Sequence, residues 1–243
     1  MAVEIERSFI LDKETFMANR MNLDLAVVRF CNNKTIHQNY LVPENSSISY
    51  NAFDQYWDVT LRYGAFDAQF TIEVDSNEHK KIVSALSKMV GDECPFENLE
   101  AIENASARVR LIGDDYKFTF KTTGVDPLAR QEFEYDIDQT AVMFENGDSF
   151  MELDPFVVKK RRTYLKTNTI GSDGKNIVLE LDEFENESFG CYLEAEFPTI
   201  KEAQEFDFSK WCVGQEITGV AGYTNKDLAL KAGYKAMTFS EVF

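Results

Sequence analysis

The stretch VEIERSFIL, residues 3–11, alternates charged and apolar side chains with the period of two that is typical of a β-strand. Glu4, Glu6 and Ser8 share one face of this strand. Two carboxylates two positions apart lie about 7 Å from each other, and at an effective dielectric constant of about 20 they repel by about 2 kcal/mol. A solvent-exposed edge strand tolerates that repulsion, so this stretch alone does not predict a functional site.

Six later segments repeat the pattern, which isolated solvent-exposed edges do not explain. The charges that share a face are Arg108 and Arg110, Lys117 and Lys121, Arg130 with Glu132 and Glu134, Glu180 and Asp182, and Glu194 and Glu196. In the sixth segment, KKRR, Lys159 and Arg161 share one face, and Lys160 and Arg162 share the other. Some segments carry only acids and others only bases, as if they faced one another across a shared space.

Strands with charged faces of both signs can enclose a polar cavity. Closing an antiparallel sheet into a barrel removes its edges and surrounds such a space. A cavity lined by both signs fits a polyanion with divalent cations, because arginines and lysines bind phosphate oxygens and carboxylates coordinate Mg²⁺ or Mn²⁺. The sequence therefore predicts a mainly β fold of the α+β class, with a barrel whose lumen is charged.

The composition bounds the class of protein. The chain has 243 residues, of which 44% are hydrophobic, so it can bury the core of a folded domain. Its net charge of -17 argues against a surface that coats nucleic acid. The apolar runs are too short to span a bilayer, and the acidic N-terminus has no apolar signal core, so we expect a cytoplasmic protein. Four scattered cysteines and two histidines predict reduced thiols and neither structural zinc nor a histidine metal site.

Between the charged segments the sequence predicts connecting elements. We expect a short helix over residues 12–20 and a hairpin that joins residues 25–30 to 35–42 across Asn32-Asn33-Lys34. Near the C-terminus, residues 225–232 have a helical pattern.

Residues 43–103 differ in character from the rest of the chain. We expect a second hairpin there, from residues 57–62 to 68–74 across Tyr63-Gly64. An amphipathic helix is predicted over residues 76–90.

The charged segments also carry a family resemblance. The motifs are EIER at Glu4, HQNYL at His37, ARVRL at Ala107, TFK at Thr119, RQEFEYDI at Arg130, KKRR at Lys159, LELDEF at Leu179 and LEAEF at Leu193. In this order they resemble the CYTH family, the triphosphate tunnel metalloenzymes, and the ending GQEITGVAGYTNKDLA from Gly214 is similar to that family's ending. The match covers nearly the whole chain except residues 43–103, which we interpret as an insertion into a single domain spanning residues 1–243.

The resemblance implies a closed, eight-stranded antiparallel tunnel with flanking helices, which binds a triphosphate with Mg²⁺ or Mn²⁺. Carried over by position, the metal ligands would be Glu4, Glu6, Glu180, Asp182, Glu194 and Glu196. The phosphate-binding residues would be Arg108, Arg110, Lys121, Arg130, Lys159 and Arg161. The residues expected to serve catalysis, by binding metal, orienting basic side chains or positioning water, are Glu4, Glu6, Glu132, Glu134 and Asp182.

The register of the KKRR segment stays open at this point. We favour Lys159 and Arg161 as the lumen residues, because that register leaves Val158 and Tyr164 on the opposite side. The alternative places Lys160 and Arg162 in the lumen. A departure from the family pattern stands at Ser8, where the family's opening ExExK has a lysine, so one cationic phosphate contact is missing.

The function implied by the resemblance is hydrolysis of a triphosphate by a metal-dependent triphosphatase. The substrate would be a small molecule such as a nucleoside triphosphate or inorganic triphosphate; nucleic acid is not expected, except as an RNA 5′-triphosphate end, and neither is a membrane. One alternative is a nucleotidyl cyclase in the same tunnel, and another is a non-catalytic module that binds nucleotides or polyphosphate. Other catalytic schemes lack their motifs, because the chain has no GxSxG, Walker or GxGxxG sequence.

Overall fold

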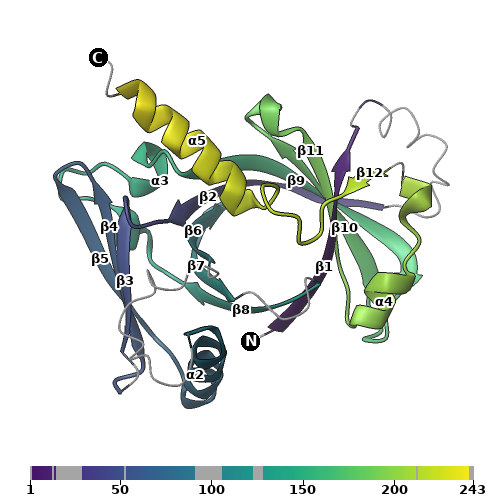
Figure 1. The fold of residues 1–243 in the computed structure, drawn as a ribbon, viewed down its shortest axis with the longest axis horizontal. Helices are drawn as coiled ribbons and strands as arrows, with labels where there is room; N and C mark the ends of the chain where they lie inside the picture. Colours follow the sequence, from purple (N-terminus) through teal and green to yellow (C-terminus); the bar gives the residue numbers. More distant parts are fainter. Residues whose placement is uncertain are drawn as a thin grey trace.

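Eight antiparallel strands close into a barrel in the computed structural model, which describes residues 2–12, 14, 29–51, 53–90, 106–122, 128–211 and 213–240 (Figure 1). Around the barrel the order is β1-β8-β7-β6-β2-β9-β10-β11, and β11 pairs with β1 to complete the ring. The strands are β1 (Ala2–Leu11), β2 (Arg29–Leu41), β6 (Ser106–Ile112), β7 (Asp115–Thr122), β8 (Ala129–Asp136), β9 (Val157–Ile170), β10 (Asn176–Phe184) and β11 (Cys191–Glu196). The predicted fold class is confirmed.

The barrel has its apolar side chains on the outside, because the alternating strands turn their charged residues inward. On β6, β7 and β8 the outward residues Val109, Phe118 and Phe133 are buried in one hydrophobic cluster. On β1, β10 and β11 a second cluster contains Ile5 and Leu193. Both clusters need a covering layer outside the barrel, and residues that flank the strands in sequence supply it.

The described residues between 43 and 90 cover the first cluster. A three-stranded antiparallel sheet, β3 (Ser46–Asn51), β4 (Tyr56–Tyr63) and β5 (Phe66–Glu73), is followed by helix α2 (Ser76–Val90). Trp57 of β4 is fully buried, with its ring 5.1 Å from that of Phe120 on the barrel. The predicted hairpin and the predicted helix are confirmed, and β3 is an additional strand. Gly64 takes a φ of 61° in the β4–β5 turn, a value that favours glycine.

Residues near the C-terminus cover the second cluster. Helix α4 (Ile200–Glu205) and the 3-10 helix η4 (Phe208–Trp211) contribute Ala203, Phe208 and Trp211 to it. Strand β12 (Val213–Glu216) then extends the sheet by pairing with β1. The other short elements are η2 (Gln139–Val142), α3 (Phe150–Leu153) and η3 (Glu187–Phe189).

The prediction of a hairpin across Asn32-Asn33-Lys34 is wrong. These residues belong to β2, which continues without a turn from Arg29 to Leu41. The strand pairs with β9 from Arg29 to Asn39, and the register shifts between Phe30 and Asn33. The polar residues thus sit at a β-bulge, which disrupts hydrogen bonding locally without reversing the chain. The helix predicted over residues 12–20 lies almost entirely outside the described residues.

Helix α5 (Asn225–Ser240) begins at the predicted position and is longer than predicted (Figure 1). It packs on β2 and β9. Close packing depends on Gly233, because the ring of Phe156, just before β9, leaves no room for a Cβ atom there. Within the described residues, no helix combines the length and apolarity needed to cross a membrane.

Replacing Gly233 with alanine is expected to lower the free energy of unfolding by about 1–3 kcal/mol, the usual cost of overpacking. This loss outweighs the gain of about 1 kcal/mol in helix propensity. Urea unfolding measures it. In a Phe156→Leu background the same substitution should cost less than about 1 kcal/mol, because the smaller side chain makes room. Equal losses in both backgrounds would contradict this account of α5 packing.

Candidate active site in the barrel lumen

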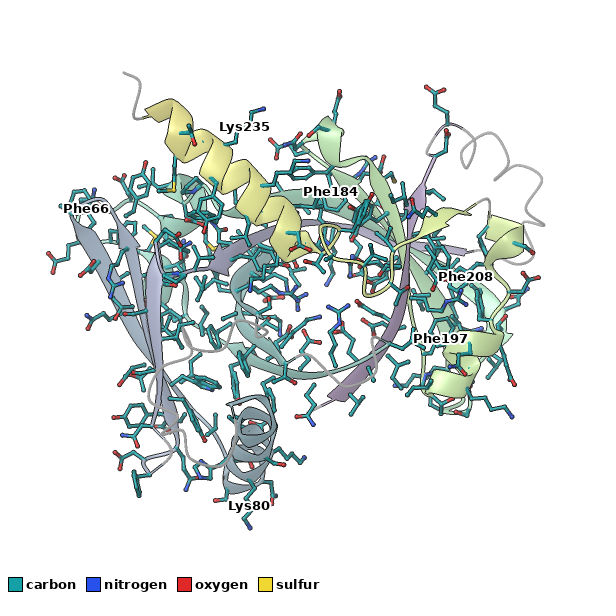
Figure 2. All side chains as sticks on the ribbon, in the orientation of Figure 1. Phe66, Lys80, Phe184, Phe197, Phe208 and Lys235 are labelled. Carbon is teal, nitrogen blue, oxygen red and sulfur yellow. The ribbon has the colours of Figure 1, made fainter. Side chains whose placement is uncertain are left out.

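The lumen of the barrel is a cavity of about 1040 Å³ lined by residues from all eight strands. Figure 2 shows side chains with nitrogen and oxygen ends pointing into the ring. The charged lining residues are Glu4, Glu6, Arg108, Arg110, Lys121, Arg130, Glu132, Glu134, Lys160, Arg162, Glu180, Glu194 and Glu196 from the strands, with Glu78, Lys226 and Asp227 from the helices. The structure therefore brings most of the predicted site residues together in one space.

The acidic residues of β1, β11 and β10 form a cluster of like charges. Glu6 lies directly opposite Glu196 in the β1–β11 pairing, and Glu194 lies opposite Glu180 in the β11–β10 pairing. Like charges directly across an antiparallel pair destabilise the sheet. Burial and the neighbouring Glu4 raise the pKa of Glu6 to about 7. Burial, Glu180 and Glu4 likewise raise the pKa of Glu196 to about 7.

These carboxylates have the chemistry of a divalent-cation site. Hard oxygen donors are the ligands that Mg²⁺ and Mn²⁺ prefer. The raised pKa values mean that nearby cationic side chains do not fully balance the negative charge. Glu196 makes no ion pair within the part of the chain that the structure describes. In the arrangement seen, however, no three acidic, histidine or cysteine side chains among the described residues are grouped closely enough to hold a metal ion.

The raised pKa of Glu196 predicts a pH-dependent penalty on stability in metal-free protein. The folded pKa of about 7 exceeds the ordinary value of 4.5, so the folded state holds this proton more tightly than the unfolded state does. The penalty therefore grows as the pH rises from about 4.5 to about 7. In EDTA, the melting temperature of Glu196→Gln minus that of wild type should increase as the pH rises through this range, and should then level off. A temperature difference that stays constant would contradict the assignment.

Arg108 is a buried cation of the lumen wall with unused hydrogen-bond donors in the described part of the chain. Its side chain is buried, with 7% of the residue exposed. The nearest carboxylate, that of Glu132, lies 3.5 Å from Nη2, beyond ordinary hydrogen-bond distance. Nη1 donates to the Tyr40 hydroxyl at 3.4 Å. Nε has no acceptor among the described residues. A buried guanidinium with free donors is suited to binding an anion.

The other predicted phosphate ligands that line the cavity are paired with acids. Arg110 contacts Glu134, yet its Nε also has no acceptor in the described part of the chain. Lys121 donates to Glu4 at 2.6 and 2.8 Å. Arg130 contacts Glu6 (this is the cation that partly balances that carboxylate). A bound polyphosphate would compete with these carboxylates for the cations. The carboxylates thus pair with the cations when no polyphosphate is bound.

The favoured register of the KKRR segment is wrong, and the alternative is right. Lys160 and Arg162 line the cavity, whereas Arg161 lies outside the barrel, where its Nε donates to Glu183 at 3.0 Å. Lys159 shares the outer face with Arg161. The reason offered for the favoured register fails because the inner face also bears apolar residues: Val158 is buried in a cluster beneath α5, and Tyr164 lines the cavity.

Arg162 joins three carboxylates of the lumen. Its guanidinium contacts Glu180 and donates to Asp182 at 2.6 and 2.7 Å and to Glu194 at 2.6 Å. Burial alone would raise the pKa of Asp182, but Arg162 and Lys160 outweigh burial and lower it to about 2. Asp182 lies behind the cavity lining and is fully buried, with both its oxygens held by these cations. We therefore assign Asp182 to positioning Arg162 and Lys160, and no longer expect it to bind metal.

Ser8 lies on the inner face of β1. Its side chain lines the cavity on the same face as Glu4 and Glu6, opposite Glu194. Its backbone N–H donates to Thr218 Oγ1 at 2.9 Å, which fixes the segment after β12 against the barrel. The predicted inward orientation of Ser8 is confirmed.

Sequence reasoning missed the uncharged lining of the cavity. Gln38, Tyr40, Tyr164 and Tyr192 line it from the strands, together with Ser106 and Ile112. Residues between 217 and 230, from the segment that leads into α5 and from the start of α5, add to this lining. Charge patterns could not identify these residues. Two other signals could have done so: alternation places Gln38 and Tyr40 on one face, and the similarity of the ending to the family marks the final segment.

Comparison with known proteins yields no matching family model and no match among curated proteins. Among solved structures, the chain is similar to the inorganic triphosphatase NE1496, at 21% identity over 95% of this chain and 96% of that chain, with a TM-score of 0.41. It is also similar to the PH1819 protein from Pyrococcus horikoshii OT3, at 14% identity over 94% and 98%, with a TM-score of 0.47. A third is HpAC1 from Hippeastrum, named as an adenylyl cyclase with a dominant triphosphatase activity, at 13% identity over 83% and 82%, with a TM-score of 0.38.

Proposed function

We propose that this protein is a metal-dependent triphosphatase of the triphosphate tunnel type, which binds the triphosphate of a small-molecule substrate in its barrel lumen. The observation that carries the proposal is Arg108, a buried guanidinium 3.5 Å from the nearest carboxylate, with Nε free among the described residues. A buried hydrogen-bond donor without an acceptor costs about 1–3 kcal/mol. An anion bound in the lumen would remove that cost.

The positions of the other cations favour a chain of phosphates over a single one. Arg108 and Arg110 are two residues apart on one face of β6, and Lys121 lies on the neighbouring strand β7. Arg130 adds a cation from β8. Four cations on three adjacent strands can contact several phosphate groups in a row, with Lys160 and Arg162 on the far wall.

The acidic cluster would hold the divalent cation. The candidate ligands are Glu4, Glu6, Glu180, Glu194 and Glu196, which offer only hard oxygen donors. When bound there, Mg²⁺ or Mn²⁺ would neutralise triphosphate charge and help to activate or position water. For this the carboxylates must release their present cations, and a triphosphate that attracts Arg130 and Lys121 away from Glu6 and Glu4 would free them.

The chain's own residues would then stabilise charge on the phosphates. Arg108 and Arg110 would donate to phosphate oxygens, and their fixed positions in the wall avoid the reorganisation that water would need. Glu132 and Glu134 would orient these arginines, as their present contacts allow. Of Glu6 and Glu196, a carboxylate that does not bind the cation could accept a proton from the attacking water.

The test is product analysis with purified protein. ATP, GTP, thiamine triphosphate and tripolyphosphate are each incubated with Mg²⁺ or Mn²⁺, and with EDTA as the control. We expect release of free phosphate that stops in EDTA. Formation of a cyclic nucleotide would instead identify a cyclase, and bound but unchanged ligand would identify a binding module; either result would overturn the proposal.

A lysine at position 8 is expected to tighten triphosphate binding. Ser8→Lys places an ammonium in the lumen opposite Glu194, where it can pair with that carboxylate or with a phosphate. One added charged contact to phosphate is worth roughly ten- to a hundred-fold in affinity. Calorimetry and thermal melting measure the two effects. A large drop in melting temperature without tighter binding would mean that this position cannot accommodate a cation.

The cytoplasmic location and the absence of a nucleic-acid partner, apart from an RNA 5′-triphosphate end, stay predictions from the sequence. The same holds for the interpretation of residues 43–103 as an insertion into one domain. Glu78 of α2 lines the cavity, so this segment reaches the lumen as well as covering the barrel.

A further inference from the structure

A buried carboxylate that does not line the cavity plays no part in the mechanism described so far. Asp154 follows helix α3, which packs against β2 and β4 (Figure 1). It is 2% exposed. Its Oδ1 accepts a hydrogen bond from Asn45 Nδ2 at 2.9 Å, and its Oδ2 accepts one from Asn39 Nδ2 at 3.0 Å. The partners of this carboxylate are therefore uncharged amides, together with the Phe156 N–H.

Stability alone does not explain an aspartate at this position. Burial raises the pKa of Asp154 to about 6, although the hydrogen bonds from Asn45 and Asn39 lower it. The folded state therefore holds the proton more tightly than the unfolded state does, and the penalty on stability grows as the pH rises from about 3.8 to about 6. At neutral pH the fold carries a buried charge among uncharged partners. Such groups are typical of functional sites.

Asn45 connects Asp154 with the end of β2. Besides donating to Asp154, its Nδ2 donates to the Tyr40 carbonyl at 2.9 Å. Its Oδ1 accepts from the Val42 N–H at 2.8 Å. A primary amide has two N–H donors, so Asp154 and Tyr40 together use both of them. The carboxylate of Asp154 thereby fixes the plane of the Asn45 amide, and that amide fixes the Tyr40 carbonyl.

Tyr40 is held from the same side by a second hydrogen bond. Its backbone N–H donates to the carbonyl of Phe156, two residues after Asp154, at 2.9 Å. Both backbone groups of Tyr40 thus point away from β6, where Arg108 is its partner in the β2–β6 register. Side chains lie closest together in such non-hydrogen-bonded pairs. The Tyr40 hydroxyl accepts from Arg108 Nη1 at 3.4 Å, so the position of Tyr40 affects that of the guanidinium.

We propose that Asp154 is a positioning residue of the phosphate site. The inference rests on the proposed function. Asp154 orients Asn45, the Asn45 amide and the Phe156 carbonyl hold the backbone of Tyr40, and the Tyr40 hydroxyl keeps Arg108 in place to bind phosphate. The Asn45 carbonyl also accepts from the Arg62 N–H of β4 at 2.7 Å. The junction between the barrel and the three-stranded sheet therefore supports the phosphate site as well.

The experiment measures the affinity for an imido analogue of tripolyphosphate, which resists hydrolysis, by calorimetry in Mg²⁺. Replacing Asp154 with alanine should weaken binding about tenfold, because a displaced Arg108 loses one charged hydrogen bond to phosphate. Asn45→Ala breaks the same connection at its other end and serves if Asp154→Ala does not fold. The matched control Asp58→Ala removes an exposed aspartate of β4 and should bind as wild type does.

A double-mutant cycle separates positioning from a merely structural role. In a Tyr40→Phe background, Asp154→Ala should weaken binding less than about twofold, because the hydroxyl that transmits the effect is already absent. A structural role would instead weaken binding equally in both backgrounds.

The conservative variant Asp154→Asn tests whether the hydrogen bonds or the charge matter. It should bind the analogue within about twofold of wild type, because the new amide can replace both bonds. Its Oδ1 can accept from Asn45. Its Nδ2 can donate to Asn39 Oδ1, which has no donor among the described residues, once the Asn39 amide turns over.

Unchanged affinity in Asp154→Ala, or equal losses with and without the Tyr40 hydroxyl, would overturn this inference and leave the proposed function intact. A loss in Asp154→Asn equal to that in Asp154→Ala would also contradict it, because the hydrogen bonds would then not be the cause. If wild-type protein does not bind the analogue, the proposed function fails, and the inference fails with it.

Discussion

Replacing Arg162 with methionine is expected to lower the free energy of unfolding by about 3–5 kcal/mol, the usual cost of removing one partner from a buried ion-pair network. Arg162 contacts Glu180, Asp182 and Glu194, and its side chain is only 11% exposed. Without it, Glu180 and Glu194 lose the cation that they contact, and Asp182 keeps Lys160. Triphosphate turnover should be lost as well, because the acidic cluster would lose its arrangement.

The neighbouring Arg161 provides a matched control. Its side chain is 57% exposed and pairs with Glu183 on the outer face of the barrel. An exposed ion pair contributes about 0–1 kcal/mol, so Arg161→Met should change the free energy of unfolding by less than about 1 kcal/mol. Urea unfolding of both variants measures the contrast. Equal losses, or a larger loss in Arg161→Met, would show that the register of β9 is wrong.

The second large effect concerns ligand binding. Replacing Arg108 with methionine should weaken triphosphate binding about a hundredfold or more, because it removes at least two charged hydrogen bonds to phosphate, each worth about 1.5–3 kcal/mol. Stability should stay the same or rise, because in the ligand-free protein this guanidinium is buried with its nearest carboxylate 3.5 Å away. Loss of binding with preserved stability would separate Arg108 from Arg162, whose removal affects both.

Calorimetric titration and thermal melting of Arg108→Met measure these two quantities, with Arg161→Met again as the control that keeps wild-type binding. If Arg108→Met unfolds at a much lower temperature than wild type, Arg108 is a structural cation held by Glu132 and Tyr40. If its affinity for triphosphate equals that of wild type, the phosphate site lies elsewhere in the lumen.

Strand alternation allowed much of the site to be predicted. On β1, β6 and β11 the two members of each charged pair are two positions apart in the sequence. They therefore share one face of their strand, because side chains alternate with a period of two. The apolar residues between them, such as Val109 and Ala195, need burial and therefore turn outward under covering layers. The local sequence therefore predicts that the charged residues of these strands point into the barrel.

Alternation could not decide the register of β9, because KKRR places cations on both faces. Only the pairing with β10, which sets Arg162 beside Asp182 and Arg161 beside Glu183, separates the two faces. The bulge in β2 has a similar origin: Asn32-Asn33-Lys34 favours a turn locally, and pairing with β9 overrides that preference. The tyrosines that line the cavity are brought together by contacts between distant segments, which no local pattern reports.

The most direct test of the central claim is a calorimetric titration with an imido analogue of tripolyphosphate, which resists hydrolysis. Wild-type protein should bind one analogue per chain, and at least about tenfold more tightly with Mg²⁺ than in EDTA, because the cation neutralises part of the charge that the acidic cluster repels. Arg108→Met should lose this binding, whereas Arg161→Met should keep it. Absence of binding to wild type in Mg²⁺, or equal binding by wild type and Arg108→Met, would contradict a triphosphate site in this barrel.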